Sequence, residues 1–120
     1  MALAATPSND ISLTPLKTPL PEANNQVGVI SLIWQEFSVY GADIAQKALL
    51  VAKCESSLDP LARNASSSAV SIYQILKGTF THYGCIGDRE NPQDNIRCAA
   101  RIYRATKSFK DWDASKQCWQ

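Results

Sequence analysis

The chain has 120 residues, of which 45% are hydrophobic and 19% are charged, so it has the composition of one globular domain with a modest core. Its net charge of +1 gives no electrostatic argument for nucleic acid as a partner. No apolar run approaches the length that a membrane span needs. We therefore expect a single domain that binds no nucleic acid and has no membrane span.

The four cysteines, Cys54, Cys85, Cys98 and Cys118, are many for so short a chain and favour two disulfides in an oxidising compartment. No C-x-x-C pair is present, and the lone His82 has no second histidine with which to share a metal. We expect neither a metal nor a cofactor. Of the three possible pairings we favour Cys85 with Cys98, which closes a short loop, and Cys54 with Cys118, which ties the chain's end to an earlier helix.

Residues 1–6 have neither the basic start nor the long apolar run of a signal peptide. We still expect a secreted, periplasmic or cell-wall protein whose sequence begins after a removed signal. The alternatives are another export route, or a cytosolic protein with four reduced thiols. Residues 1–24 are rich in Ser, Thr, Pro and Asn, which predicts a disordered arm or linker before a folded domain at 25–120.

The first elements of the folded domain are two helices. Apolar residues recur at helical spacing over 27–38, and Gly41 ends that pattern in a C-cap role. Asp43 can cap a second helix that begins near residue 42 and runs to about residue 54 or 56, and that cannot continue through Pro60.

A polar loop is expected over 57–71, followed by a brief extended or turn segment at 72–75. Residues 79–83 are expected to form a short helix closed by Gly84. Any β structure is expected to be minimal and to lie within 66–75.

A strong helix start follows, because Asn91 can cap, Pro92 suits the first turn and Asp94 faces the positive end of the helix dipole. The buried face of this helix is expected to consist of Ile96, Ala99, Ala100 and Tyr103. Asp111 can cap a last short helix that ends near residue 118. The sequence thus predicts a mainly α domain with about five helices.

Glu55 shares one face of the second helix with Ile44, Ala48 and Val51, at successive spacings of four, three and four. An unpaired carboxylate is costly to bury, and desolvation raises the pKa of a glutamate. Glu55 is therefore a candidate general acid. The alternative is that it lies at the helix end, where this face opens to water.

Three segments with Glu55-Ser56 at their head follow one another in a recognisable order. They are CESSLDPLARN (54–64), SSSAVSIYQILKGTF (66–80) and NPQDNIRCAARIYRATK (91–107). Over about residues 27–119 the chain resembles the lytic transglycosylase and goose-type lysozyme superfamily in its small single-domain form. That family joins Glu-Ser, a loop with proline and an A-x-N-like step, a G-L-x-Q-I/F segment and a helix that opens with N-P and contains Tyr. The resemblance implies a lysozyme-like fold.

The resemblance also implies a peptidoglycan lytic transglycosylase, which we expect to act on glycan strands as a monomer. Glu55 would protonate the leaving oxygen of the MurNAc-GlcNAc β-1,4 bond. As base it would then take the proton of the muramic C6 hydroxyl, which attacks C1 with assistance from the N-acetyl group. The product is a 1,6-anhydroMurNAc end, and one carboxylate suffices, unlike the two-carboxylate scheme.

Five further positions match substrate-contacting positions of the family: Ser56, Asn64, Tyr73, Gln74 and Tyr103. Each also has a structural interpretation. Ser56 could cap the helix end and Asn64 the loop, the two tyrosines could pack in the core, and Gln74 could be a buried structural amide.

Two alternatives keep the same fold. A hydrolytic lysozyme would need a second carboxylate, for which the candidates are Asp59, Asp88, Glu90 and Asp94. A non-catalytic glycan-binding module is suggested by Ser71, where the family usually has Gly, a residue that allows unusual backbone angles or close approach of a sugar. A third possibility, from another class, is a small disulfide-stapled interaction protein without a glycan role.

Overall fold

The computed structural model describes residues 25–120, and the arm expected at 1–24 lies outside the described residues. The described part contains five α-helices and two 3-10 helices, and its only β structure is a pair of isolated bridges, Arg63–Val70 and Val70–Ile75. This confirms a mainly α domain with a minimal β segment. No helix within this part is long and apolar enough to cross a membrane.

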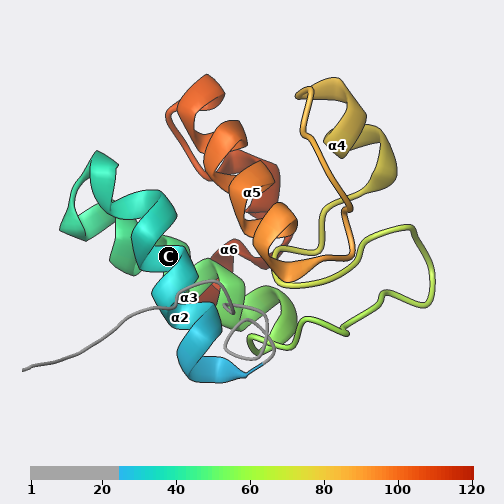
Figure 1. The fold of residues 1–120 in the computed structure, drawn as a ribbon, viewed down its shortest axis with the longest axis horizontal. Coiled ribbons are helices and arrows are strands. Elements are labelled where there is room, and N and C mark those ends of the chain that lie inside the picture. The colour runs from blue at the N-terminus through green and yellow to red at the C-terminus, as the bar shows by residue number, and fades with distance from the viewer. Residues whose placement is uncertain (1–24) are drawn as a thin grey trace, which may run out of the picture.

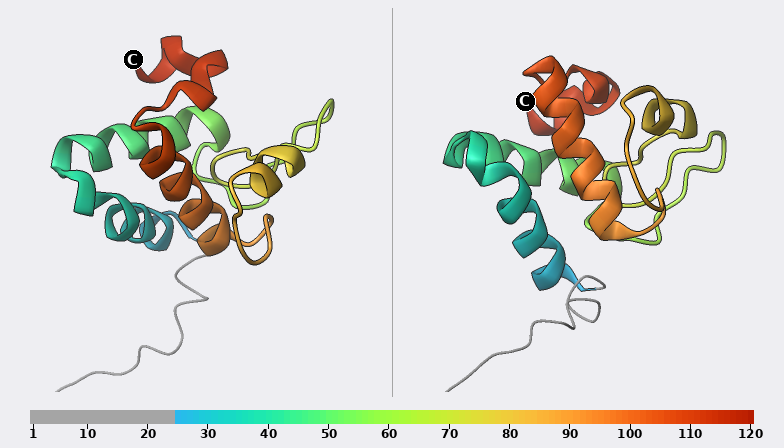
Figure 2. Two further views of the ribbon diagram at one scale, coloured as in Figure 1. Left: turned by 90° about the horizontal axis from the view of Figure 1, so that it is seen from above. Right: turned by 45° about the horizontal axis from the view of Figure 1, so that its top comes forward.

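The helices lie in a compact arrangement in which segments from both ends of the domain meet. In chain order they are α2 (Gln26–Phe37), η2 (Ser38–Tyr40), α3 (Ala42–Ser56), α4 (Lys77–His82), α5 (Pro92–Thr106), η3 (Lys110–Ser115) and α6 (Lys116–Trp119). Helix α2 contacts both α3 and α5, while η3 and α6 pack against α3 (Figures 1 and 2). The C-terminal segment is thereby placed beside the helix that carries Glu55.

The junction between α2 and α3 differs from the sequence prediction in its caps. Gly41, with φ 113°, ends η2 and also occupies the N-cap position of α3. Because the N-cap is two residues before Asp43, this carboxylate lies in the first turn of the helix and makes no capping hydrogen bond. The prediction that Asp43 caps the helix was wrong, although its charge still complements the helix dipole.

Helix α5 begins as its sequence predicts. The Oδ1 atom of Asn91 accepts a hydrogen bond from the Asp94 N–H at 3.0 Å, with Pro92 in the first turn. The buried residues of the helix are Asn95, Ile96, Cys98, Ala99, Ala100 and Ile102. Tyr103 is only partly buried, because it lies at the edge of the core rather than within it.

The core joins apolar residues of α2, α3 and α5 to a group of aromatic rings from the later segments. Tyr73 belongs to this group, with its ring centroid 6.0 Å from Phe37 and 5.6 Å from Trp112. The Trp112 indole N–H also donates to the Tyr73 carbonyl at 2.8 Å. Segment 110–119, which carries Trp112, is therefore held against the loop that precedes α4.

Asn95 organises the loop 57–76 from a fully buried position on α5. Its Oδ1 accepts from the Tyr73 N–H at 2.8 Å, and its Nδ2 donates to the carbonyls of Val70 (3.1 Å) and Arg89 (2.9 Å). These bonds satisfy backbone groups that no sheet or helix satisfies. One side chain thus fixes the loop that forms a wall of the site described next.

Candidate active site

Glu55 lies in the last turn of α3, where the chain leaves the helix through two residues in the left-handed conformation. Ser57 (φ 56°) is the C-cap, its N–H donating to the Lys53 carbonyl, and Leu58 (φ 63°) follows. Leu58 is buried, which draws the chain away into the core. The end of the helix is thereby left open on the side of Glu55, which is half-buried.

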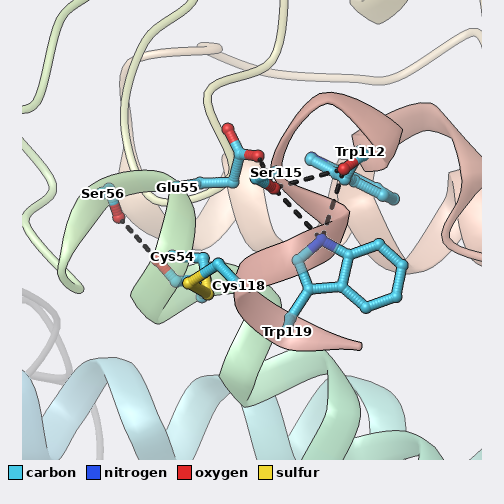
Figure 3. The surroundings of a disulfide bond; sticks show 8 residues. Cys54, Glu55, Ser56, Trp112, Ser115, Cys118 and Trp119 are labelled. Atoms are coloured by element: carbon cyan, nitrogen blue, oxygen red, sulfur yellow. Dashed lines mark hydrogen bonds between the residues drawn. A yellow bond between two sulfur atoms is a disulfide. The ribbon is translucent and has the colours of Figure 1, made fainter.

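The carboxyl group of Glu55 has one partner within residues 25–120. The Ser115 hydroxyl donates to Oε2 at 2.5 Å, and the second carboxyl oxygen points away from Ser115 (Figure 3). Burial raises the pKa of Glu55 above its ordinary value of 4.5, and the hydrogen bond from Ser115 acts in the opposite direction. The group therefore has the property that a general acid needs, a proton retained to higher pH than usual.

A pocket of about 280 Å³ opens beside Glu55. The loop after α3 contributes Asn64 and Gln74, and η3 contributes Asp111 and Trp112. Such a mixture of a few polar groups with apolar walls is typical of small-ligand sites. Glu55 is thus a carboxylic acid at the edge of a cavity with room for part of a ligand.

Gln74 and Asn64 are the two sequence-predicted substrate residues that the structure brings to Glu55. The Gln74 backbone is left-handed (φ 48°), and its Nε2 donates to the carbonyls of Ala62 (3.1 Å) and Ser71 (2.9 Å). With both amide hydrogens used in this way, the amide oxygen is the group left to accept a bond from a ligand. Asn64 is exposed, and its Oδ1 accepts from the Ser66 N–H at 2.7 Å.

Ser56, Tyr73 and Tyr103 do not line this pocket. The Ser56 hydroxyl is buried and lies 2.8 Å from the Ile72 carbonyl, so it joins the end of α3 to the loop. Tyr73 is fully buried and donates its hydroxyl to the Ala48 carbonyl at 2.7 Å; burial raises its pKa well above 10.0. Tyr103 packs on Phe109 at 4.9 Å and lines a different cavity.

None of the four carboxylates considered as a second catalytic group lines the pocket. Asp59 caps the Leu61 N–H, and Glu90 pairs with an arginine. Asp88 accepts a hydrogen bond from the Glu90 N–H, and Asp94 accepts one from the Asp88 N–H, in the loop before α5. The carboxylate that does line the pocket is Asp111, which the sequence suggested only as a helix cap.

Both disulfides have the connectivity that we favoured from the sequence. Cys54 pairs with Cys118 and Cys85 with Cys98, and no free cysteine remains among the described residues. The first of these bonds lies next to Glu55 and joins the helix α3 to α6 (Figure 3). Within residues 25–120 no group of three His, Cys, Asp or Glu side chains is gathered to hold a metal ion.

A larger cavity of about 550 Å³ lies between α2 and α5. Of the residues expected to act on a substrate it contains only Asp94, a candidate second carboxylate for a lysozyme. Its charged lining is mostly arginine: Arg97, Arg101 and Arg104. Size alone would favour this cavity, but an acid with a raised pKa at its edge belongs to the smaller one. We therefore place the candidate active site at Glu55.

Sequence reasoning missed Ser115 and Asn95 altogether. Ser115 is 60 positions from Glu55, and only the pairing of Cys54 with Cys118 could have indicated that the two are neighbours. Asn95 could have been noticed as a polar residue on the apolar face of its helix, next to Ile96 and Ala99.

The family of the chain follows from a comparison with models of protein families. The model described as Transglycosylase SLT domain matches residues 22–115, which is most of the chain. A search of curated proteins gave no match, and neither did a search of solved structures. The family match confirms both the resemblance seen in the motifs and the lysozyme-like, mainly α fold. The chain belongs to the transglycosylase SLT domain family.

Proposed function

We propose that this protein is a lytic transglycosylase that cleaves the MurNAc-GlcNAc β-1,4 bond of peptidoglycan outside the cytoplasm, as a monomer. The observation that carries the proposal is Glu55, a half-buried carboxyl with a raised pKa at the edge of a pocket. A family whose domain is named for transglycosylation supports the same reaction class. Two disulfides are compatible with an oxidising compartment.

In the first step the neutral Glu55 donates its proton to the glycosidic oxygen, and the bond between that oxygen and C1 of the muramic sugar breaks. In the second step the ionised Glu55 removes the proton of the C6 hydroxyl on the same sugar. The C6 oxygen then bonds to C1, which gives the 1,6-anhydro ring. The acid is regenerated, and no water is consumed.

We assign the remaining residues by their position relative to the pocket. Gln74 and Asn64 line it and are proposed to contact the sugar, Gln74 through its amide oxygen. Ser56 and Tyr73 are proposed to support the site indirectly, since their buried hydroxyls bond to backbone carbonyls and do not line the pocket. For Tyr103 the packing on Phe109 supports a structural role.

The test is to incubate the protein with purified sacculi and to measure the masses of the released fragments. Anhydro-muropeptides are expected, lighter by one water than the hydrolysis products. Glu55→Gln should retain the fold and lose at least about 10²-fold in rate, since general acid–base catalysis contributes about 10²–10⁴-fold. Binding of glycan without fragments, by a folded protein, would instead support a non-catalytic module.

A hydrolytic lysozyme is the second candidate, and one observation favours it: Asp111 lines the same pocket as Glu55. A second carboxylate could activate a water or stabilise the cation formed at C1. Fragments with reducing ends, lost on replacing Asp111 by Asn, would select the lysozyme over the lyase.

A further inference from the structure

Ser115 lies at the end of η3 within hydrogen-bonding distance of three groups. Its Oγ is 2.5 Å from Glu55 Oε2 and 3.2 Å from the Trp112 carbonyl, and it accepts the indole N–H of Trp119 at 3.1 Å (Figure 3). A serine hydroxyl has one proton and two acceptor sites. The Trp119 bond occupies one acceptor site and leaves the proton free to be shared between Glu55 and the Trp112 carbonyl.

The shorter of these two contacts favours donation to Glu55. A bond to an ionised oxygen is stronger and shorter than a bond to a neutral carbonyl, so the preference is greatest when Glu55 is ionised. When Glu55 is neutral, a donated bond at Oε2 leaves the other oxygen, Oε1, to carry the proton. Oε1 points away from Ser115 and has no partner among residues 25–120.

We propose that Ser115 is the positioning residue of the catalytic acid: its hydroxyl holds Oε2 through both steps of the reaction and makes Oε1 the oxygen that gives and regains the proton. This inference rests on the proposed transglycosylase function. Ser115 itself touches neither the substrate nor the reacting atoms in this scheme.

Two attachments hold Ser115 where this role requires. On one side the Cys54–Cys118 disulfide ties α6 to the residue directly before Glu55. On the other side the Trp112 indole is fixed to the Tyr73 carbonyl at 2.8 Å. The hydroxyl is thus pre-organised between two anchored points, and orienting it costs little entropy at the moment of reaction.

The charges around Glu55 are few, so the hydroxyl is a substantial part of its surroundings. Asp111 on η3 is the other charged residue that lines the pocket. The lysines of the packed elements line other cavities: Lys47, Lys110 and Lys116 line one, and Lys53 lines another. Lys47 lies over the Trp119 ring at 5.6 Å. Loss of the Ser115 hydroxyl therefore removes the group that favours the ionised form of Glu55.

The test compares Ser115→Ala, which removes the hydroxyl, with Ser115→Thr, which keeps it. Ser108→Ala is the matched control, because Ser108 lies just before η3 and its hydroxyl accepts a hydrogen bond from the Lys110 N–H at 3.4 Å. The side-chain carboxyl of Glu55 is titrated by NMR in protein labelled with ¹³C-glutamate, and kcat and KM are measured on sacculi against pH. Thermal unfolding confirms that each variant is folded.

We expect Ser115→Ala to move the Glu55 titration to higher pH, together with the alkaline limb of the rate profile. It should lower kcat by about 10- to 100-fold with KM nearly unchanged, because a misdirected acid stabilises the transition state less but affects substrate binding little. Ser115→Thr should restore the titration and most of kcat, and Ser108→Ala should match the wild type.

Failure of the two proposals can be told apart. An active wild type whose titration is unmoved in Ser115→Ala, or whose rate Ser115→Thr does not restore, overturns the role of Ser115 alone. A folded wild type that releases no fragments overturns the proposed function. In that case a titration that still moves in Ser115→Ala supports the hydrogen bond to Glu55, and an unmoved one overturns it as well.

Discussion

The carbonyl of Ser71 accepts two hydrogen bonds from Gln74, one from the backbone N–H at 3.1 Å and one from the side-chain amide at 2.9 Å. Both residues have left-handed backbone angles, φ 68° for Ser71 and φ 48° for Gln74. Ser71 is also fully buried, and its hydroxyl has no hydrogen-bond partner among the described residues. The turn that aims Gln74 at the pocket therefore contains a strained and unsatisfied residue.

Ser71→Gly is expected to stabilise the protein. A left-handed non-glycine residue costs about 1–2 kcal/mol and an unpaired buried hydroxyl about 1–3 kcal/mol, against about 0.5–1 kcal/mol for the extra backbone entropy of glycine. We expect a net gain of about 1–4 kcal/mol, which is measured as a rise in Tm of roughly 4–8 °C per kcal/mol for a domain of this size.

Ser71→Ala serves as the control for this gain, because it removes the hydroxyl and keeps the strain. It should lie between the wild type and Ser71→Gly in stability. If alanine is as stable as glycine at this position, backbone strain contributes nothing and the argument from φ is refuted.

Local signals explain which parts of the fold could be predicted. The start of α5 is determined by Asn91 and Pro92 themselves, and the structure forms it as the sequence predicts. At α3 two residues close in sequence could each form the N-cap. Asp43 was expected to cap the helix, but Gly41 occupies the N-cap position. A sequence pattern locates such a helix well but not its first residue.

Only the part of the candidate site that lies close to Glu55 in the sequence could be predicted. Glu55 follows from its place on an apolar helical face, whereas Ser115 and Asp111 come from a segment brought near by the Cys54–Cys118 bond. Tyr73 matched a family position but lies in the core, because its hydroxyl reaches the Ala48 carbonyl instead of the pocket. A motif match thus identifies a corresponding residue, but tertiary contacts determine whether its side chain faces the pocket or the core.

Tyr73→Phe is therefore expected to lower stability rather than substrate affinity. Loss of a buried hydroxyl bonded to the Ala48 carbonyl costs about 0.5–1.5 kcal/mol. Urea denaturation measures this cost, and KM on sacculi should stay within about twofold of the wild type. A clearly raised KM at unchanged stability would assign Tyr73 to substrate binding, as its position in the motif suggested.

The two disulfides should differ in what they contribute to the site. They span 64 and 13 residues, so the chain-entropy model gives about 4 kcal/mol for Cys54–Cys118 and about 3 kcal/mol for Cys85–Cys98. We expect the paired alanine variant of the first to lose more activity than that of the second under conditions where both are folded. Equal losses of activity would show that the bond beside Glu55 has no special role in the site.

Glu55 is expected to lower the stability of the protein at neutral pH. Its pKa in the folded state is raised by burial above the ordinary value of 4.5, so between these two values the folded chain holds a proton that the unfolded chain has released. Where the folded state binds more protons, the free energy of unfolding falls as pH rises. The carboxyl is therefore tolerated at acidic pH and costs stability above its folded pKa.

Glu55→Gln should consequently have a higher Tm than the wild type at neutral pH, and this advantage should shrink to nothing as the pH falls below about 4. Asp113→Asn is a matched control, because it removes one carboxylate from an exposed position in the same region. Thermal unfolding measured across this pH range gives the two curves. Parallel curves for the wild type and Glu55→Gln would mean that the Glu55 carboxyl is not strained by burial. Converging curves, together with loss of activity in Glu55→Gln, would identify a group whose burial costs stability and serves its role as an acid.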